Sequence, residues 1–162
     1  MNVLTGDKNV DLMILDNLDD KSLLSFCLTN QDANRLCSID SFWRNRLIRK
    51  YGNIQIKTGK TWKQFYLSIL KYWDDDMNEA MINAALGGHQ DLVNFFISKG
   101  ANNWNRGMYG AAQGGHKDLV DFFISKGANS WNWGKNNALS GGHKDLVKFF
   151  KQKMIKGHFE EN

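Results

Sequence analysis

The chain has 162 residues, which allows one ordinary domain or two small ones and is too short for a large catalytic scaffold. Its hydrophobic fraction of 42% and charged fraction of 23% are those of a folded globular protein, and they exclude a disordered or fibrous one. Cys27 and Cys37 are too few for a disulfide framework and lack the close pairing of zinc ribbons. We therefore expect buried or idle thiols in a reducing compartment.

The N-terminal sequence bears on where the protein works. Asp7, Asp11 and Asp16 interrupt the segment where a signal peptide needs an apolar stretch, and no later run is long enough to span a bilayer. We therefore expect an intracellular protein that has no membrane partner.

The net charge of +4 is unevenly distributed along the chain. Residues 1–40 hold seven acids and three bases, residues 41–73 hold eight bases and no acid, and residues 74–162 hold ten of each. The basic block either attracts phosphate, RNA or an acidic protein surface, or it is a solvated helix face. Charge alone does not choose among these readings.

Apolar spacing predicts short helices in the N-terminal region. A first helix is predicted over residues 10–18 and a second over 23–28, with Asp7 and Asp20 as N-caps. A basic helix begins at Ser41. A further helix opens at Thr61-Trp62, continues to Trp73, and belongs to a basic connecting region over residues 51–76.

Three helices within about the first fifty residues, closing on a tryptophan, resemble the F-box. The residues that match the motif are Leu12, Ile14, Leu15, Leu18, Leu23, Leu24, Leu36, Ser41, Phe42 and Trp43. Gly6-Asp7 stands where the family has Leu-Pro. The resemblance implies an F-box-like domain over residues 1–50 that binds a Skp adaptor subunit of SCF ubiquitin ligases. It assigns that binding to Leu12, Ile14, Leu15, Leu18, Leu23, Leu24 and Trp43.

The C-terminal half repeats itself every 27 residues. Gly-Gly-His recurs at residues 87–89, 114–116 and 141–143, and it marks units over 77–103, 104–130 and 131–157. Each unit predicts a short first helix, a Gly-Gly break and an amphipathic second helix. One such hairpin does not bury its own apolar stripe, so we expect neighbouring units to stack.

These units resemble the ankyrin family in Ala84-Ala85, His89, Asp91-Leu92-Val93 and Gly100-Ala101. The resemblance implies an all-α solenoid of three helical hairpins over residues 77–162, whose last unit forms a polar cap. The family period is about 33 residues, so the protruding loop is trimmed here. An F-box followed by such units is similar to proteins encoded by giant DNA viruses of amoebae, which implies the cytoplasm of a host cell.

The positions that change between units cluster in the first helix, and we expect them to face solvent or ligand. In ankyrin stacks the first helices line the concave face, so the resemblance implies that these side chains bind a target protein. They are Glu79, Ile82, Asn83, Leu86, Arg106, Tyr109, Gln113, Trp133, Asn136, Asn137 and Ser140. Trp133 is the strongest candidate for exposed contact, because no aromatic residue holds its place in the other units.

Three histidines at a fixed period suggest a metal site. However, packed helices lie roughly 10 Å apart, whereas zinc needs nitrogen ligands about 2 Å from one point. We therefore interpret His89, His116 and His143 as structural residues that cap or bridge the turn into each second helix. The only carboxylate run, residues 74–76, reads as a helix boundary.

The sequence therefore predicts a non-enzymatic adaptor without a cofactor, which bridges an unidentified target protein and a ubiquitin ligase. One alternative is a decoy that binds a host protein without recruiting a ligase. Another is nucleic-acid binding through the basic block, although no recognition-helix signature accompanies its charge. That reading would place phosphate contacts at Arg44, Arg46, Arg49, Lys50, Lys57, Lys60 and Lys63.

Overall fold

The computed structural model describes residues 4–52, 54, 59–73 and 75–159, and over these residues the protein is all-α, without a strand. Their eleven helices are α1 (Lys8–Asn17), α2 (Asp20–Thr29), α3 (Gln31–Cys37), α4 (Asp40–Tyr51), α5 (Trp62–Tyr72), α6 (Met77–Leu86), α7 (Gln90–Ser98), α8 (Trp104–Gly114), α9 (Lys117–Ser125), α10 (Trp131–Ser140) and α11 (Lys144–Phe159). The all-α prediction is confirmed. Among the described helices, none combines the length and the apolar character that crossing a bilayer requires.

The chain divides into two compact units, Met1–Leu67 and Ser68–Asn162. The boundary falls inside α5, so the predicted connecting region over residues 51–76 is shared between the two. The first is the N-terminal unit and the second is the C-terminal unit.

The N-terminal unit contains one helix more than the sequence predicts. Asp7 caps α1 as expected, but α2 is capped by Asp19 and not by Asp20, which is the first residue of the helix. The additional helix is α3. Its extended N-cap residue Asn30 accepts a hydrogen bond from the backbone of Ala33 at 2.9 Å, so the chain leaves α2 and starts a new helix at once. Seven residues are too few to show a clear apolar period.

The core of the N-terminal unit forms around aromatic and leucine side chains from four helices. Its fully buried members are Leu15, Leu23, Trp43, Leu47, Phe65 and Tyr66. Trp43 donates its indole N–H to the carbonyl oxygen of Cys37 at 2.8 Å, which satisfies the polar atom of this buried ring.

Cys27 and Cys37 form a disulfide between α2 and α3, with their Cα atoms 6.0 Å apart. Both residues are buried, as predicted, but the prediction of idle thiols is wrong. The second cysteine lies at the end of α3, the helix that sequence periodicity missed, so the proximity of the two residues was not visible.

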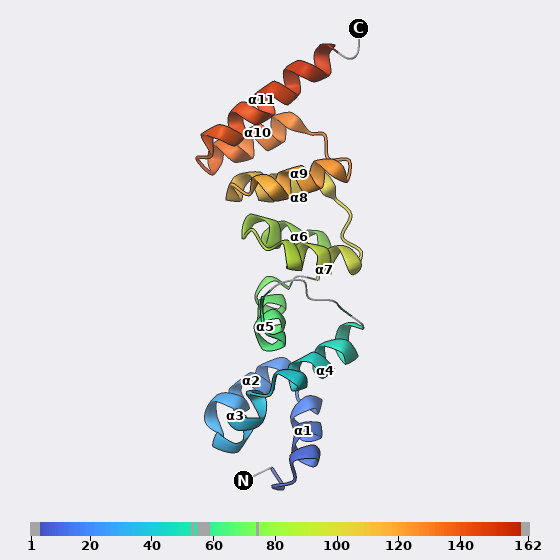
Figure 1. Cartoon of the computed structure of the whole chain (residues 1–162), viewed down its shortest axis with the longest axis vertical. Coiled ribbons are helices and arrows are strands. Elements are labelled where there is room, and N and C mark those ends of the chain that lie inside the picture. Colours follow the sequence, from blue (N-terminus) through green and yellow to red (C-terminus); the bar gives the residue numbers. More distant parts are fainter. Residues whose placement is uncertain (1–3, 53, 55–58, 74, 160–162) are drawn as a thin grey trace. The chain divides into compact units, whose positions relative to one another are not determined.

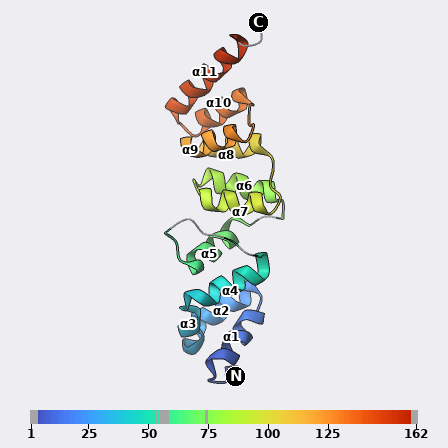
Figure 2. The same cartoon turned by 45° about the vertical axis from the view of Figure 1, so that its right-hand side comes forward.

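The C-terminal unit contains three antiparallel helix pairs, α6 with α7, α8 with α9, and α10 with α11, and the first helices α6, α8 and α10 also pack on one another in order (Figures 1 and 2). This packing is that of helical hairpins. Within the second and third pairs a phenylalanine ring fills the space beside a glycine, Phe123 against Gly107 and Phe150 against Gly134. Burying such a ring contributes about 1.5–3 kcal/mol.

Candidate functional site

Histidine side chains link successive hairpins of the C-terminal unit. His116 Nε2 lies 3.1 Å from the carbonyl oxygen of Leu86, and His143 Nε2 lies 3.0 Å from that of Gln113. A carbonyl oxygen only accepts hydrogen bonds, so each Nε2 carries the proton and donates it to the preceding hairpin. The histidines were predicted to cap or bridge the turn into the second helix, whereas in the structure His116 and His143 each contact the preceding hairpin.

The glycines before each histidine make room for this contact. A Cβ on Gly114 would lie 2.2 Å from the carbonyl oxygen of Leu86, and one on Gly141 would lie 2.1 Å from that of Gln113. The following glycine, Gly115, has φ of 80°, which a residue with a Cβ rarely adopts. The Gly-Gly-His sequence is thus the contact surface between hairpins.

His89 meets a side chain instead of a carbonyl group. Its Nε2 lies 3.0 Å from the hydroxyl oxygen of Tyr72, which belongs to the last turn of α5. Although His89 and His116 occupy the N-cap positions of α7 and α9, neither side chain makes a capping hydrogen bond, so the capping part of the prediction is wrong. Over the described residues, no group of three or more His, Cys, Asp or Glu side chains is placed to hold a metal ion.

Asparagine side chains form a second link between hairpins. The side-chain oxygen of Asn78 accepts hydrogen bonds from the backbone N–H groups of Asn102 and Asn103, both at 2.9 Å. At the next junction, Asn105 accepts from two backbone N–H groups in the same way, at 2.9 and 3.0 Å. These two asparagines fix the loops that lead into α8 and α10.

The predicted target-binding positions lie on α6, α8 and α10, and none of them is buried. The exposed ones are Asn83, Leu86, Arg106, Gln113, Trp133, Asn136 and Ser140, and the partly exposed ones are Glu79, Ile82, Tyr109 and Asn137. We call these eleven residues the variable face. Trp133 is 62% exposed, which is unusual for a tryptophan.

Two contacts connect neighbouring helices across the variable face. Arg106 on α8 forms an ion pair with Glu79 on α6. Tyr109 on α8 stacks on Trp133 of α10, with ring centroids 6.1 Å apart and an angle of 30° between the planes. The variable face carries little net charge, because its charged members Glu79 and Arg106 neutralise each other. The face offers an aromatic pair, of which Trp133 is exposed and Tyr109 partly exposed, and amide side chains, a composition that suits a protein ligand better than phosphate.

The seven residues predicted to bind a Skp subunit fall into two groups. Leu15, Leu23 and Trp43 are fully buried and belong to the core, so they shape the surface without touching a partner. The partly exposed ones are Leu12, Ile14, Leu18 and Leu24. Sequence reasoning missed the most exposed apolar residues of the region, Met13 at 67% and Leu28 at 82%. The helical period could have identified Met13 and Leu28, because both residues lie outside the buried apolar stripe of the motif.

Gly6 and Asp7, which replace the Leu-Pro of the F-box family, form a turn that depends on these residue types. Gly6 has φ of 88°, and the N–H of Asp7 donates to the hydroxyl oxygen of Thr5 at 3.1 Å. Proline has no N–H to donate, and leucine rarely adopts this φ. Restoring the family residues would therefore disrupt the start of α1.

Arg46 is the centre of a buried polar network in the N-terminal unit. Only 5% of it is exposed. Its guanidinium donates to the carbonyl oxygens of Asp16 and Leu18 at 2.7 and 2.6 Å, to Asp20 Oδ1 at 2.8 Å and to the Tyr66 hydroxyl at 3.0 Å. The network joins the end of α1 and the start of α2 to α4 and α5.

The pKa values follow from these contacts. Burial alone would raise the pKa of Asp20, but hydrogen bonds from Lys50, Tyr66 and Arg46 outweigh it and hold the pKa below its usual range. Burial lowers the pKa of Arg46, and its bonds to Asp20 and Tyr66 raise it by more. Burial and the hydrogen bond to Asp20 raise the pKa of Tyr66 to about 12. Asp20 and Arg46 are thus ionised, and Tyr66 is neutral, at neutral pH.

Three bases of the basic block, all on α4, are engaged within the N-terminal unit. Arg46 is buried, Arg49 pairs with Asp16, and Lys50 pairs with Asp20. Two of the acids of residues 1–40, Asp16 and Asp20, thus pair with bases of α4, which accounts for part of the uneven charge distribution. Arg46 has no access to a phosphate group, so its assignment as a nucleic-acid contact is wrong. Lys57, also named in that reading, lies outside the described residues.

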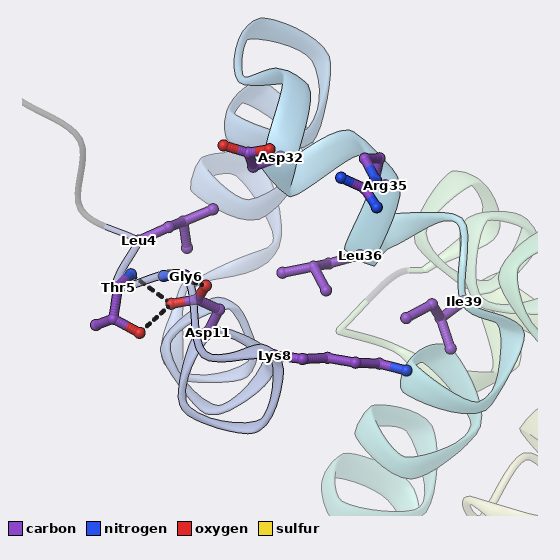
Figure 3. Close-up of a pocket in the computed structure, with 9 residues that line it drawn as sticks. All are labelled: Leu4, Thr5, Gly6, Lys8, Asp11, Asp32, Arg35, Leu36 and Ile39. Carbon is purple, nitrogen blue, oxygen red and sulfur yellow. Dashed lines mark hydrogen bonds between the residues drawn. The ribbon is translucent and has the colours of Figure 1, made fainter.

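A cavity of about 450 Å³ lies between the start of α1 and α3 (Figure 3). The buried Asp11 carboxylate at its edge accepts hydrogen bonds from the N–H and hydroxyl groups of Thr5 at 2.6 and 2.8 Å and from the N–H of Gly6 at 3.0 Å. Burial raises the pKa of Asp11, but these bonds lower it below its usual value. This carboxylate is committed to the turn before α1, which leaves it unsuited to acid–base chemistry.

Comparison with protein-family models, with curated proteins and with solved structures found no match to this chain. The functional assignment therefore rests on the geometry of the two units and on the resemblances in sequence.

Proposed function

We propose that the chain is a non-enzymatic adaptor whose C-terminal unit is an ankyrin-like stack that holds a target protein on the variable face. The observation that carries this proposal is the stacked pair of the partly exposed Tyr109 and the exposed Trp133, set in a frame whose junctions repeat while the surface residues differ. Tryptophan and tyrosine are the side chains that most often dominate the energy of protein–protein contacts.

We further propose that the N-terminal unit, with its F-box-like sequence, docks on a Skp adaptor subunit of an SCF-type ubiquitin ligase of the infected host cell. Its exposed apolar side chains support this part. Val10 and Met13 lie three residues apart on α1 and share a face of the helix, and Leu28 is exposed on α2. The target would then be brought to the ligase by a chain that performs no chemical step and needs no cofactor.

The ligase part is tested by titrating the full chain with a purified Skp adaptor subunit in a calorimeter. Met13→Asp and Leu28→Asp place a charge on exposed apolar positions, so the fold should survive and binding should fall at least tenfold. Asn45→Asp is the matched control, because it adds the same charge to an exposed position of a different helix, α4. Leu15→Asp is unsuitable, since this buried residue holds the core. No binding by the unmodified chain would refute the ligase part and leave a decoy that binds a host protein.

The target part is tested by capture of proteins from amoebal lysate on the immobilised chain, followed by mass spectrometry. Trp133→Ala should remove the captured target, while Asp118→Ala, at an exposed position of α9, should not. Equal capture by both variants would show that the variable face is not the binding surface. Binding of RNA that persists at physiological salt would favour the nucleic-acid alternative.

A further inference from the structure

The two internal junctions of the C-terminal unit show what covers a first helix when another hairpin follows it. At both junctions an alanine is fully buried, Ala85 on α6 and Ala112 on α8. The asparagine at the second position of the unit, Asn78 or Asn105, accepts hydrogen bonds from two backbone N–H groups of the incoming loop. The carbonyl oxygen of Leu86 or Gln113 accepts the incoming histidine. Each hairpin therefore presents an asparagine, a small apolar residue and a carbonyl group to the next.

The last hairpin presents the same three features to solvent. Asn132 follows Asn78 and Asn105 in the 27-residue register, and it is exposed. Leu139 replaces the buried alanines and is 66% exposed. Ser140, whose carbonyl group corresponds to those of Leu86 and Gln113, is exposed as well.

The other end of the stack is closed by a side chain that imitates a preceding hairpin. The Tyr72 hydroxyl contacts His89, as the carbonyl groups contact the later histidines. It would also lie 2.8 Å from a Cβ on Gly87, in the position that a carbonyl oxygen holds beside Gly114 and Gly141. In a second copy of the chain, His89 is thus already in contact with Tyr72, which disfavours head-to-tail stacking of copies.

We propose that the exposed edge of α10, formed by Asn132, Leu139 and Ser140, is a docking surface for a helical hairpin of another protein. The partner supplies an imidazole N–H to the Ser140 carbonyl group, two backbone N–H groups to Asn132, and a glycine- or alanine-lined helix against Leu139. This edge shares Ser140 with the variable face, but it would use the main-chain carbonyl group of that residue and repeat the contacts by which the chain binds its own hairpins.

One substitution distinguishes this edge from an internal junction and narrows the partner. Lys135 replaces Met81 and Met108, both fully buried, and is itself partly exposed. A lysine here repels the same edge of a second copy, which also disfavours a symmetric dimer. The partner therefore carries a carboxylate or a carbonyl group opposite Lys135.

The test uses the full chain and a fluorescent synthetic peptide with the sequence of residues 104–130, the segment that binds the equivalent edge of α6. We expect saturable binding with a gain of helical circular dichroism. Leu139→Asp should weaken it at least tenfold, and Lys135→Met, which restores the internal residue, should tighten it severalfold. Asn83→Ala on α6 is the control and should change nothing. A peptide affinity that neither Leu139→Asp nor Lys135→Met changes would overturn the proposal.

A second measurement covers the case in which the free peptide binds too weakly to detect. The same 27 residues are joined to the C-terminus by a flexible glycine–serine linker, which raises their effective concentration to about the millimolar range. Docking should raise Tm by about 4–8 °C, and replacing the tethered histidine with alanine should remove the gain. A tethered hairpin without effect on Tm would refute the docking surface. Dimerisation of the unmodified chain that Leu139→Asp abolishes would assign the edge to a second copy instead.

Discussion

The internal contacts that stabilise the N-terminal unit differ in kind from those that stabilise the C-terminal unit. In the N-terminal unit, one buried arginine binds two carboxylates, a tyrosine and two carbonyl groups contributed by distant parts of the chain. In the C-terminal unit, one small set of contacts recurs at each junction. The first arrangement depends on a single residue, whereas the second spreads stability over equivalent positions. The units should therefore respond differently to single substitutions.

The largest effect is expected from Arg46→Met, which leaves the carboxylates of Asp16 and Asp20 without their central partner. Removing one member of a buried ionic network costs about 3–5 kcal/mol. Hydrogen exchange followed by mass spectrometry should show the loss of protection in α1, α2 and α4. Arg44→Met is the control, because Arg44 is exposed and makes only a ring contact with Trp62 at 5.5 Å. A change below about 1 kcal/mol for Arg46→Met would contradict the central role of the network.

Reduction of the disulfide should be the next largest effect, and it should be confined to the N-terminal unit. Cys27 and Cys37 are 10 residues apart, and closing a loop of that size stabilises a fold by about 3 kcal/mol in the chain-entropy model. Dithiothreitol should therefore speed exchange in α2 and α3. The double variant Cys27→Ser with Cys37→Ser should not respond to the reductant. Equal exchange with and without dithiothreitol would show that the bond adds no stability.

Gly141→Ala tests whether neighbouring hairpins of the C-terminal unit approach each other as closely as the structure indicates. Gly141 has φ of −78°, so alanine fits its backbone, and such a change normally stabilises a protein by about 0.4–1 kcal/mol. Here the new methyl group would meet the Gln113 carbonyl oxygen, and overpacking of this kind costs about 1–3 kcal/mol. Asn136→Ala, at an exposed position of α10, should stay within about 0.5 kcal/mol in the same urea titration. A stabilised Gly141→Ala protein would disprove the close approach.

The smallest effect is a difference in pH dependence. The pKa of Asp20 lies below its ordinary value of 3.8, so its ionised form stabilises the folded state above that value. This contribution is lost as the pH falls through the lower pKa of the folded state. Asp20→Asn should therefore show a shallower fall in the free energy of unfolding between about pH 5 and pH 2. Parallel urea-midpoint curves for the two proteins would contradict the assignment.

The difference between the recurring contacts of the C-terminal unit and the single network of the N-terminal unit explains which features the sequence could predict. The hairpins of the C-terminal unit and the exposure of the variable face followed from periodicity, because each contact recurs in register. The role of Gly-Gly-His as a junction was only half predicted, since the carbonyl partners Leu86 and Gln113 lie 30 residues before their histidines. No pattern in a single sequence marks that pairing.

In the N-terminal unit the decisive contacts leave almost no trace in the sequence. Arg46 stands among other basic residues, and nothing local shows that it is buried or that its carboxylate partners lie some 30 residues earlier. The excess of acid before residue 41 and of base after it was the available signal. From the sequence this excess suggested an external ligand or a solvated helix face, whereas in the structure Arg49 and Lys50 pair with carboxylates of the same unit. Charge counts do not separate these cases without the fold.

The recurring junction also has a genetic consequence. An in-frame duplication or loss of one 27-residue unit would bring an asparagine, a carbonyl group and a Gly-Gly-His turn into the same register as before. The Arg106–Glu79 and Tyr109–Trp133 pairs do not recur, so the same event would break them. Recombination within the gene would therefore change the side chains of the variable face while the contacts between hairpins persist.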